Sequence, residues 1–274
     1  METFNFDSLN LKKIKTAIDV GCGNGRHLKS LGFRLFNAKI IGIDQSGEEI
    51  TKLQDEFSDH ICKNQNSYEF SIGDVRNIDL EDNSQDLVIC SEVLEHVPNF
   101  KDVLKECYRI LKPGAVMLIS VPSYLPESLC WKYSKEYMQT PGGHIRIFKK
   151  AFLKECFEEL HLKVFKYHRE HAIHSIYWIL KARNNMQEDK FLKSLHALLV
   201  RQMFGQAKIS LFIEKMLNPF FGKSEALRQT IRVFLETHLK EIFCLLKGTP
   251  SFSNRASNTL IISELMLFFI VAYT

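Results

Sequence analysis

The sequence predicts an α/β fold, a doubly wound sheet of seven mostly parallel strands whose last strand is antiparallel, with a helical insertion near the C-terminus. Three observations predict this fold class. Apolar runs of strand length alternate with stretches of helical spacing over residues 17–168. The first run ends in a glycine-rich turn, and the last apolar run of strand length is Leu265 to Tyr273. Because strands that alternate with helices form a parallel sheet, a ligand site is expected outside their carboxyl ends.

Composition indicates an ordinary globular chain. The 274 residues are 45% hydrophobic and 25% charged. A net charge of +4 and a pI near 8.6 fall short of a dedicated nucleic-acid domain, so no stable nucleic-acid complex is expected. Seven scattered cysteines without a C-x-x-C pair predict free thiols. No signal peptide or transmembrane segment is recognised, which together with the thiols predicts a cytoplasmic location.

The chain is predicted to divide into three parts. Residues 1–183 carry the alternating pattern and form the core, and residues 184–250 turn wholly helical and form an insertion or cap. Within this insertion, Ser224 is predicted to begin the clearest helix. Residues 251–274 are a C-terminal segment predicted to return to the sheet. In this interpretation Leu265 to Tyr273 is the final antiparallel strand beside the sixth; the competing interpretation is a peripheral membrane contact.

The first strand is followed by Gly21, Gly23 and Gly25, which permit a sharp turn and a close ligand approach. The spacing G-x-G-x-G differs from the G-x-G-x-x-G of dinucleotide-binding turns. Asp19 precedes the turn, and its carboxylate would repel a pyrophosphate but attract an ammonium or sulfonium group. The ligand is therefore expected to carry positive charge.

Residues Ile18 to Gly25 resemble the first motif of class I S-adenosylmethionine (SAM)-dependent methyltransferases, whose sheet is Rossmann-like. The resemblance implies that SAM is the cofactor, that the glycine loop packs against its methionine part, and that Asp19 lies near its amino group or holds the loop. A glycine turn without a ligand is the alternative. The full predicted cofactor set is Asp19, Gly21, Cys22, Gly23, Gly25, Asp44, Gln45, Asp74, Val75 and Ser91.

Two later strands also end in acidic residues. The strand at 39–44 ends in Asp44, 25 residues beyond Asp19, where a carboxylate can accept both ribose hydroxyls. Its alternative role is an N-cap for the helix that opens near Ser46. The strand at 68–72 leads into Asp74 and Val75, which the resemblance places on the adenine side. A turn aspartate is the alternative interpretation of Asp74.

The fourth strand, 86–91, leads directly into Glu92, Glu95 and His96. In a helical turn these three share a face, and one divalent cation could bridge them. A similar E-x-x-E-H occurs in quinone O-methyltransferases and also in relatives without a metal, so a metal is not favoured. The alternative is that the glutamates cap a helix and His96 packs under the cofactor. The sequence lacks the D/N-P-P-Y and proline–cysteine signatures of base-methylating enzymes.

Residues 100–112 and 149–160 predict helices, and 115–121 and 161–168 predict the fifth and sixth strands. The aromatic segment 122–148 between them is expected to form a loop that acts as a substrate lid. It partly resembles small-molecule methyltransferases of the type 11 and ubiquinone–menaquinone subgroup in two runs, Pro126 to Trp131 and Gly142 to Arg146, and the resemblance continues at His171 to Trp178. His144 and Arg146 could orient an anionic or phenolic substrate, or form a loop-to-helix cap. The three histidines at 168, 171 and 174 lack acidic or cysteine partners for a metal.

These features predict a SAM-dependent methyltransferase that acts on a small-molecule or lipid-like acceptor. Such a transfer needs alignment and, for some acceptors, a base, for which His96 and His144 are the candidates. The alternatives are an RNA or protein methyltransferase, and a catalytically inactive SAM-binding regulator or scaffold. The sequence carries no signal for the methylated atom or for the oligomeric state.

Overall fold

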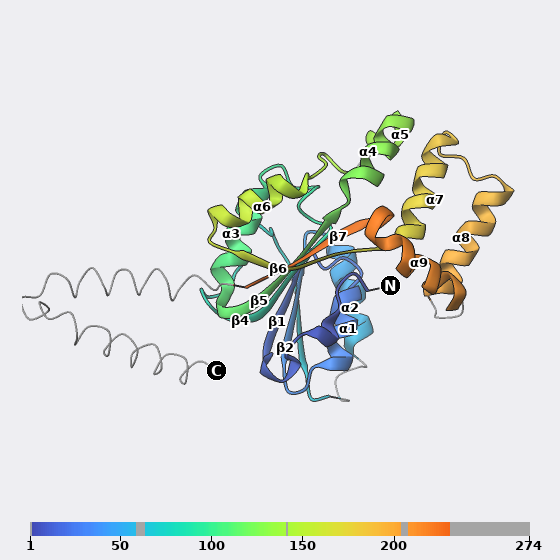
Figure 1. The fold of residues 1–274 in the computed structure, drawn as a ribbon. Helices are drawn as coiled ribbons and strands as arrows, with labels where there is room; N and C mark the ends of the chain where they lie inside the picture. Colours follow the sequence, from blue (N-terminus) through green and yellow to red (C-terminus); the bar gives the residue numbers. More distant parts are fainter. Residues whose placement is uncertain (1, 59–63, 141, 204–207, 231–274) are drawn as a thin grey trace, which may run out of the picture. The chain divides into compact units, whose positions relative to one another are not determined.

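A computed structural model describes residues 2–58, 64–140, 142–203 and 208–230. They form a seven-stranded sheet of order β3-β2-β1-β4-β5-β7-β6 (Figure 1). β7 is antiparallel to both of its neighbours, and the other paired strands are parallel. The predicted fold class is therefore confirmed. The strands are β1 Thr16–Val20, β2 Lys39–Asp44, β3 Ser67–Ile72, β4 Gln85–Ser91, β5 Leu111–Pro122, β6 Lys163–Glu170 and β7 Ser224–Thr230.

Helices follow most strands, as a doubly wound sheet requires. In the described residues they are α1 Arg26–Arg34, α2 Gly47–Ser58, α3 Phe100–Ile110, α4 Tyr124–Tyr133, α5 Lys135–Met138, α6 Lys150–Glu159, α7 Ala172–Arg183, α8 Lys190–Met203 and α9 Lys208–Phe221. Within those residues, no helix combines the length and the apolar character that crossing a bilayer requires.

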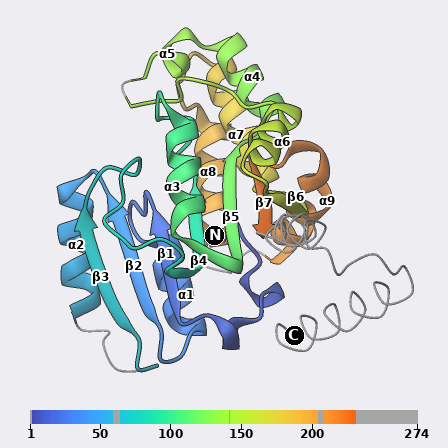
Figure 2. The same cartoon turned by 90° about the vertical axis from the view of Figure 1, so that its left-hand side faces the viewer.

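The sheet is buried on both faces, so its central strands are continuously apolar. Val88 and Cys90 of β4 belong to one core cluster, and Leu87 and Ile89 belong to the other, as the two-residue period of a strand dictates. Residues of α3 and α6 complete the first cluster, and residues of α1 and α2 complete the second. Figure 1 shows these helix pairs on opposite sides of the sheet, and Figure 2 shows α2 beside β3.

The reversed strand lies earlier in the chain than predicted. We expected a helix from Ser224 and the antiparallel strand at 265–273, but Ser224–Thr230 is itself the antiparallel strand β7. The helix prediction for this stretch is wrong because pairing with β5 and β6 outweighs the helix preference of Glu225 and Ala226. The predicted strand at 265–273 and the parts of the predicted segments beyond residue 230 lie outside the described residues.

The segment after β5 is more ordered than the predicted loop. α4 and α5 occupy its first half, and an irregular stretch leads from α5 to α6. α7 packs against α4, and α7 and α8 share a small core of their own built on Ile173, Tyr177, Leu192 and Leu199. The helical prediction beyond residue 184 holds for α8 and α9. α7 therefore lies between the segment that follows β5 and the helices α8 and α9.

Candidate active site

A cleft of about 970 Å³ opens at the carboxyl ends of β1, β2, β3 and β4. This is the edge where ligands bind in doubly wound sheets. The volume lies at the upper end of the range of about 300–1,000 Å³ that is usual for small-molecule and cofactor sites. The cleft is lined by the glycine turn, the residues after β2 and β3, the turn after β4, and the loop after α5. The lining residues used below are Gly21, Gly23, Asp44, Gln45, Asp74, Val75, Glu92, His96 and His144.

The glycine turn is shaped so that the backbone faces the cleft. Gly21 and Gly23 have φ values of 73° and 47°, which side chains rarely adopt. A Cβ on Gly21 would lie 2.4 Å from Val93, whereas a Cβ on Gly23 would meet no protein atom within 4 Å. Gly23 therefore leaves open a space that a ligand can fill. Gly25, also with positive φ, precedes α1 and lies away from the cleft against Leu53.

Asp19 lies behind this turn as an unpaired buried acid. Its side chain is 1% exposed, and neither carboxyl oxygen has a hydrogen-bond partner among the described residues. Burial raises the pKa of Asp19 to about 8, with Arg26 opposing the shift. Asp19 does not itself line the cleft. An unpaired carboxyl group at this depth is complementary to a cationic group of a ligand bound on the glycine turn.

Asp44 connects the end of β2 to the glycine turn. Its Oδ2 accepts a hydrogen bond of 2.8 Å from the amide of Gly23, and its Oδ1 accepts one of 2.9 Å from the amide of Ser46. The cap of α2 is Ser46, whose Oγ accepts from the amide of Glu49 at 3.3 Å. The helix-capping role considered for Asp44 thus belongs to its neighbour, while Asp44 holds the turn and faces the cleft.

The remaining predicted cofactor residues divide into two groups. Gln45, Asp74 and Val75 line the cleft. Asp74 is paired with the guanidinium of Arg76, which holds the pKa of the Asp74 carboxyl below its usual range. Cys22 and Ser91 are buried and do not line the cleft, and Ser91 Oγ lies 2.8 Å from Ser120 Oγ.

The segment after β4 is a tight turn and not the helical turn considered for it. Glu92 has a φ of 57° and accepts a hydrogen bond of 3.1 Å from Ser120. Arg146 fixes the turn from outside by donating to the carbonyls of Leu94, Val97 and Pro98. Arg146 therefore positions the turn, and it does not line the cleft as a substrate contact.

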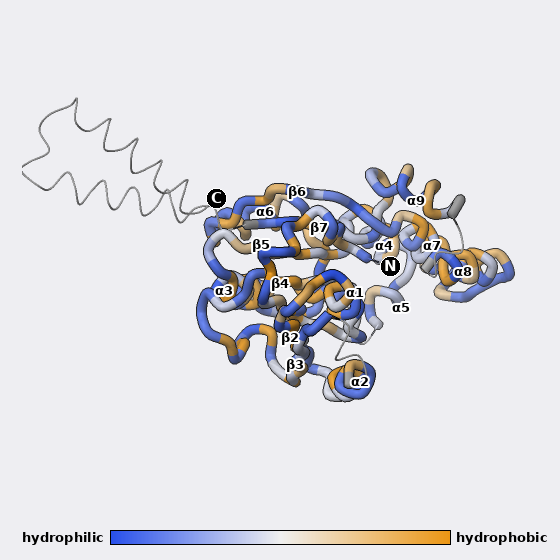
Figure 3. The backbone as a smooth tube through the Cα atoms, turned by 90° about the horizontal axis from the view of Figure 1, so that it is seen from below, coloured by the Kyte–Doolittle hydropathy of each residue, from blue (hydrophilic) through white to orange (hydrophobic). Residues whose placement is uncertain are grey.

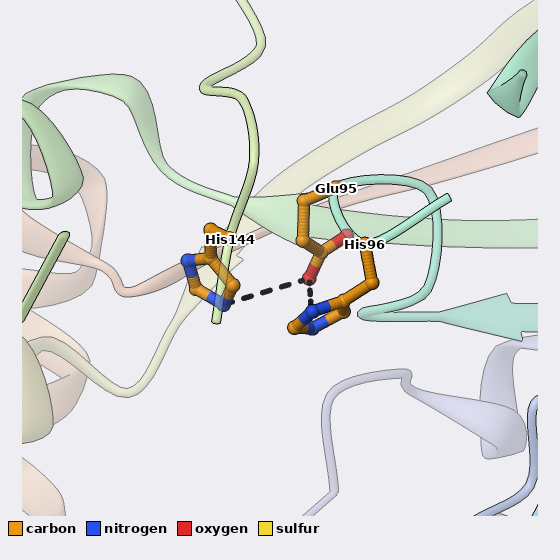
Figure 4. Close-up of side chains that lie close together, drawn as sticks. All are labelled: Glu95, His96 and His144. Carbon is orange, nitrogen blue, oxygen red and sulfur yellow. Dashed lines mark ion pairs between the residues drawn. The ribbon is translucent and has the colours of Figure 1, made fainter. Parts of the chain in front are cut away.

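Glu95, His96 and His144 converge at this turn (Figure 4). Glu95 Oε1 lies 3.8 Å from His96 Nε2 and 4.0 Å from His144 Nε2. Glu95 is fully buried, and burial together with the charge of Glu92 raises its pKa well above the usual range. Glu92 is not part of this group, so the structure does not assemble the three ligands considered from the sequence. Within the described residues, the three histidines from 168 to 174 form no such group either.

Glu127 of α4 is a site residue that the sequence did not predict. It is buried and accepts hydrogen bonds from Trp131 at 3.1 Å, Tyr137 at 3.2 Å and His144 Nδ1 at 2.7 Å. Only the four-residue step from Glu127 to Trp131 was visible in the sequence, because the other two partners meet it through tertiary structure. His144 Nδ1 donates to this carboxylate, which leaves Nε2 as the acceptor.

Comparison with known proteins identifies the core. Residues 18–119 match the family described as "Methyltransferase domain". A ubiquinone biosynthesis O-methyltransferase of Dechloromonas aromatica is 33% identical over 122 residues, which are 42% of this chain and 47% of that protein. An uncharacterized methyltransferase of Schizosaccharomyces pombe is 26% identical over 184 residues, covering 64% of this chain and 68% of that protein. Against the first curated relatives, the matched part is a third to about half of their length.

The fold has a matching solved structure. The [4+2]-cyclase SpnF is 17% identical with a TM-score of 0.55, and the match covers 82% of this chain and 78% of that protein. At this identity the likeness shows the fold alone.

Proposed function

Because the chain carries a class I SAM-dependent methyltransferase domain over residues 18–119, we propose that it transfers the methyl group of SAM to a hydroxyl group of a small-molecule or lipid-like acceptor. The observation that carries the proposal is the pair Glu127 and His144, which holds a basic nitrogen beside the cleft. The ubiquinone biosynthesis O-methyltransferase among the relatives supports an oxygen acceptor. Its modest identity leaves the acceptor itself to experiment.

The cleft offers complementary groups for each part of SAM. The open space over Gly23 fits the methionine part, and the buried acid Asp19 fits its amino group. Asp44 faces the cleft with carboxylate oxygens suited to ribose hydroxyls, and Asp74 and Val75 lie where the adenine would follow. When bound, SAM supplies a methyl group on a positively charged sulfur.

Of the two candidate histidines, His144 is the base in this proposal, and His96 lies beside it with its ring centroid 5.0 Å away. Nδ1 of His144 is held by Glu127, so Nε2 carries the lone pair that can take a proton. His96 is turned with Nδ1 3.2 Å from the carbonyl of Gly143, and burial and the charge of His144 lower its pKa. Glu95 lies 4.0 Å from His144 Nε2, and burial raises its pKa well above the usual range, which disfavours a charge on Glu95.

In the transfer, His144 Nε2 removes the proton of the acceptor hydroxyl while the oxygen forms its bond to the methyl carbon. The carbon–sulfur bond breaks, and its electron pair remains on sulfur, which becomes neutral. The products are a methyl ether, S-adenosylhomocysteine and a proton carried by His144. Glu127 stabilises the imidazolium that forms, and the protein otherwise contributes alignment.

The test is formation of S-adenosylhomocysteine with a panel of phenols, catechols, aliphatic alcohols and amines. We expect turnover with a hydroxyl acceptor, and a loss of kcat of about a hundredfold or more in His144→Gln, with SAM affinity unchanged. Glu127→Gln should lower kcat and alter its pH profile, whereas His161→Gln, an exposed histidine, should do neither. SAM binding without turnover on any acceptor would favour the regulator or scaffold, and turnover only on RNA or protein would favour those alternatives.

A cytoplasmic location belongs to the same proposal. The described cysteines Cys22, Cys90, Cys107, Cys130 and Cys156 are free and buried. Free thiols of this kind are typical of a reducing compartment. We expect the full chain to be recovered from the cytoplasm with these thiols reduced.

A further inference from the structure

Helix α9 buries its polar side and exposes its apolar side, which is the reverse of an ordinary surface helix. Ser210, Glu214 and Asn218 recur every four residues and are 5%, 4% and 8% exposed. Phe212, Met216 and Phe220 recur with the same step and are 68%, 63% and 66% exposed. A helix on the surface of a globular protein buries its apolar stripe and exposes its polar one. The hydropathy colouring of Figure 3 shows the mixed character of this helix.

The inverted orientation is fixed by specific contacts of the polar side. Asn218 Oδ1 accepts a hydrogen bond of 3.0 Å from the amide of Ala172, at the start of α7. Asn218 Nδ2 donates to Glu170 of β6 at 2.7 Å. Glu214 accepts from the side chain of Gln202 in α8. Since three elements hold the polar side, α9 cannot rotate to bury its phenylalanines without breaking these bonds.

We define the α9 face as the exposed apolar side chains of this helix, namely Leu211, Phe212, Ile213, Met216, Phe220 and Phe221. They lie on one 14-residue helix. Phe191, Leu198 and Val200 of the neighbouring α8 are exposed as well. Exposed apolar side chains concentrated in this way mark an interaction surface, whereas single ones are ordinary.

The segment that forms α8 and α9 is positively charged, which favours an anionic partner. Residues 190–223 contain six lysine or arginine residues and a single acidic one, Glu214. Glu214 is buried on the polar side of α9, away from the exposed apolar side chains, and burial with the charge of Glu170 raises its pKa to about 7. Exposed Lys193 and Lys215 stand on the same helices as the apolar side chains. An apolar stripe among positive charges fits the interface of an anionic bilayer.

The helices that carry this surface are connected to the cleft through α7, which packs against α8 and α9 on one side and against α4 on the other. The ring of Trp178 in α7 lies 5.8 Å from the ring of Tyr137 in α5, centroid to centroid. Tyr137 donates to Glu127, and the next residue, Met138, lines the cleft. A partner bound to α9 would therefore sit on the group of helices that reaches the wall of the cleft.

From these observations we propose that the α9 face docks on the surface of an anionic lipid bilayer, with the helix lying in the interface. The phenylalanines and Met216 would enter the boundary between headgroups and acyl chains, while Lys193 and Lys215 would meet anionic headgroups. This docking goes beyond the proposed methyl transfer, and it can be measured in the absence of SAM.

The experiment is flotation of the full chain with vesicles of phosphatidylcholine alone and of phosphatidylcholine with phosphatidylglycerol. We expect binding to the anionic vesicles that weakens at high salt. The triple variant Phe212→Ser, Met216→Ser and Phe220→Ser should reduce the partition coefficient about a hundredfold or more. Phe33→Ser is the matched control, because Phe33 is 71% exposed on α1 and its loss should leave binding unchanged.

A second pair of variants tests the electrostatic part. Lys193→Gln with Lys215→Gln should lower binding to anionic vesicles by about fivefold for each lysine, whereas Lys12→Gln should not change it. Unchanged SAM affinity shows that each variant is folded. Absence of vesicle binding, or equal binding by wild type and the triple variant, would overturn the proposal. So would a concentration-dependent dimer of wild type that the triple variant loses while neither protein floats, since the occupant would then be a second copy.

Discussion

At the scale of single residues, Asp19 is the group whose chemistry depends most directly on the ligand. A carboxyl with a pKa of about 8 is mostly protonated at pH 7. An ammonium group placed nearby favours the ionised form and lowers that pKa. Binding of SAM at neutral pH should therefore release the proton of Asp19, if Asp19 faces the amino group of SAM.

Calorimetry in buffers of different ionisation enthalpy measures this release. We expect wild type at pH 7 to release close to one proton more per SAM than Asp19→Asn does, and the difference to shrink as the pH rises above 8, where Asp19 is already ionised. Equal proton release by the two proteins would contradict the contact. Asp19 would then serve only to hold the glycine turn.

The acidic turn after β4 supports a prediction about metals. The pKa of Glu95 lies well above its usual range, and His144 and His96 already bond to Glu127 and to the carbonyl of Gly143. To bind a metal, Glu95 would have to be deprotonated, and the ligating nitrogens of the two histidines would have to be free of a proton. We expect turnover to survive thorough chelation. Activity that disappears with chelator, returns with magnesium or manganese, and is absent in Glu95→Gln would show a metal enzyme instead.

Local spacing predicted much of the cleft lining at the strand ends and little of the lining that comes from the loop after α5. Of the predicted cofactor residues, Gly21, Gly23, Asp44, Gln45, Asp74 and Val75 line the cleft. Their positions follow from strand ends, which the apolar pattern reveals. Glu127 was missed because its partner His144 is 17 residues away, and their contact arises only when α4 packs beside the loop that carries His144.

At the scale of elements, β7 shows where sequence patterns fail. Glu225 and Gln229 of β7 are buried between β5 and the edge strand β6 although their side chains are polar, and Arg169 pairs with Glu225 at 2.8 Å. A stripe of apolar residues at helical spacing, beginning with Leu227 and Ile231, predicted a helix from Ser224. The strand forms because β5 and β6 each offer a row of unpaired backbone groups, which no local pattern records.

This placement of β7 makes a stability prediction. Leu227 is 3% exposed and belongs to the same core cluster as α3 and α6. Leu227→Ala should lower the free energy of unfolding by about 2–5 kcal/mol, because it leaves a cavity in this core cluster. Leu198→Ala on the exposed side of α8 is the matched control and should cost far less. Urea denaturation measures both, and equal effects would argue against the observed burial of β7.

At the scale of the whole molecule, the family match covers the strand ends proposed to bind SAM and leaves out the elements proposed to contact the acceptor. The family match ends at residue 119, and the elements that hold His144, Glu127 and the α9 face all lie beyond it. This division explains why the sequence predicted the fold class and the donor more fully than the acceptor. In the proposed function α4, α5 and the loop around His144 contact the acceptor, and the family match does not extend to them.

The most direct test of the central claim follows the methyl group itself. Purified full-length protein is incubated with SAM labelled in its methyl carbon and a cell extract separated into small molecules, lipids, RNA and protein. We predict label in the small-molecule or lipid fraction as a methyl ether, lost in His144→Gln and retained in His161→Gln. Label confined to RNA or protein, or no transfer to any fraction by a protein that binds SAM, would contradict the account.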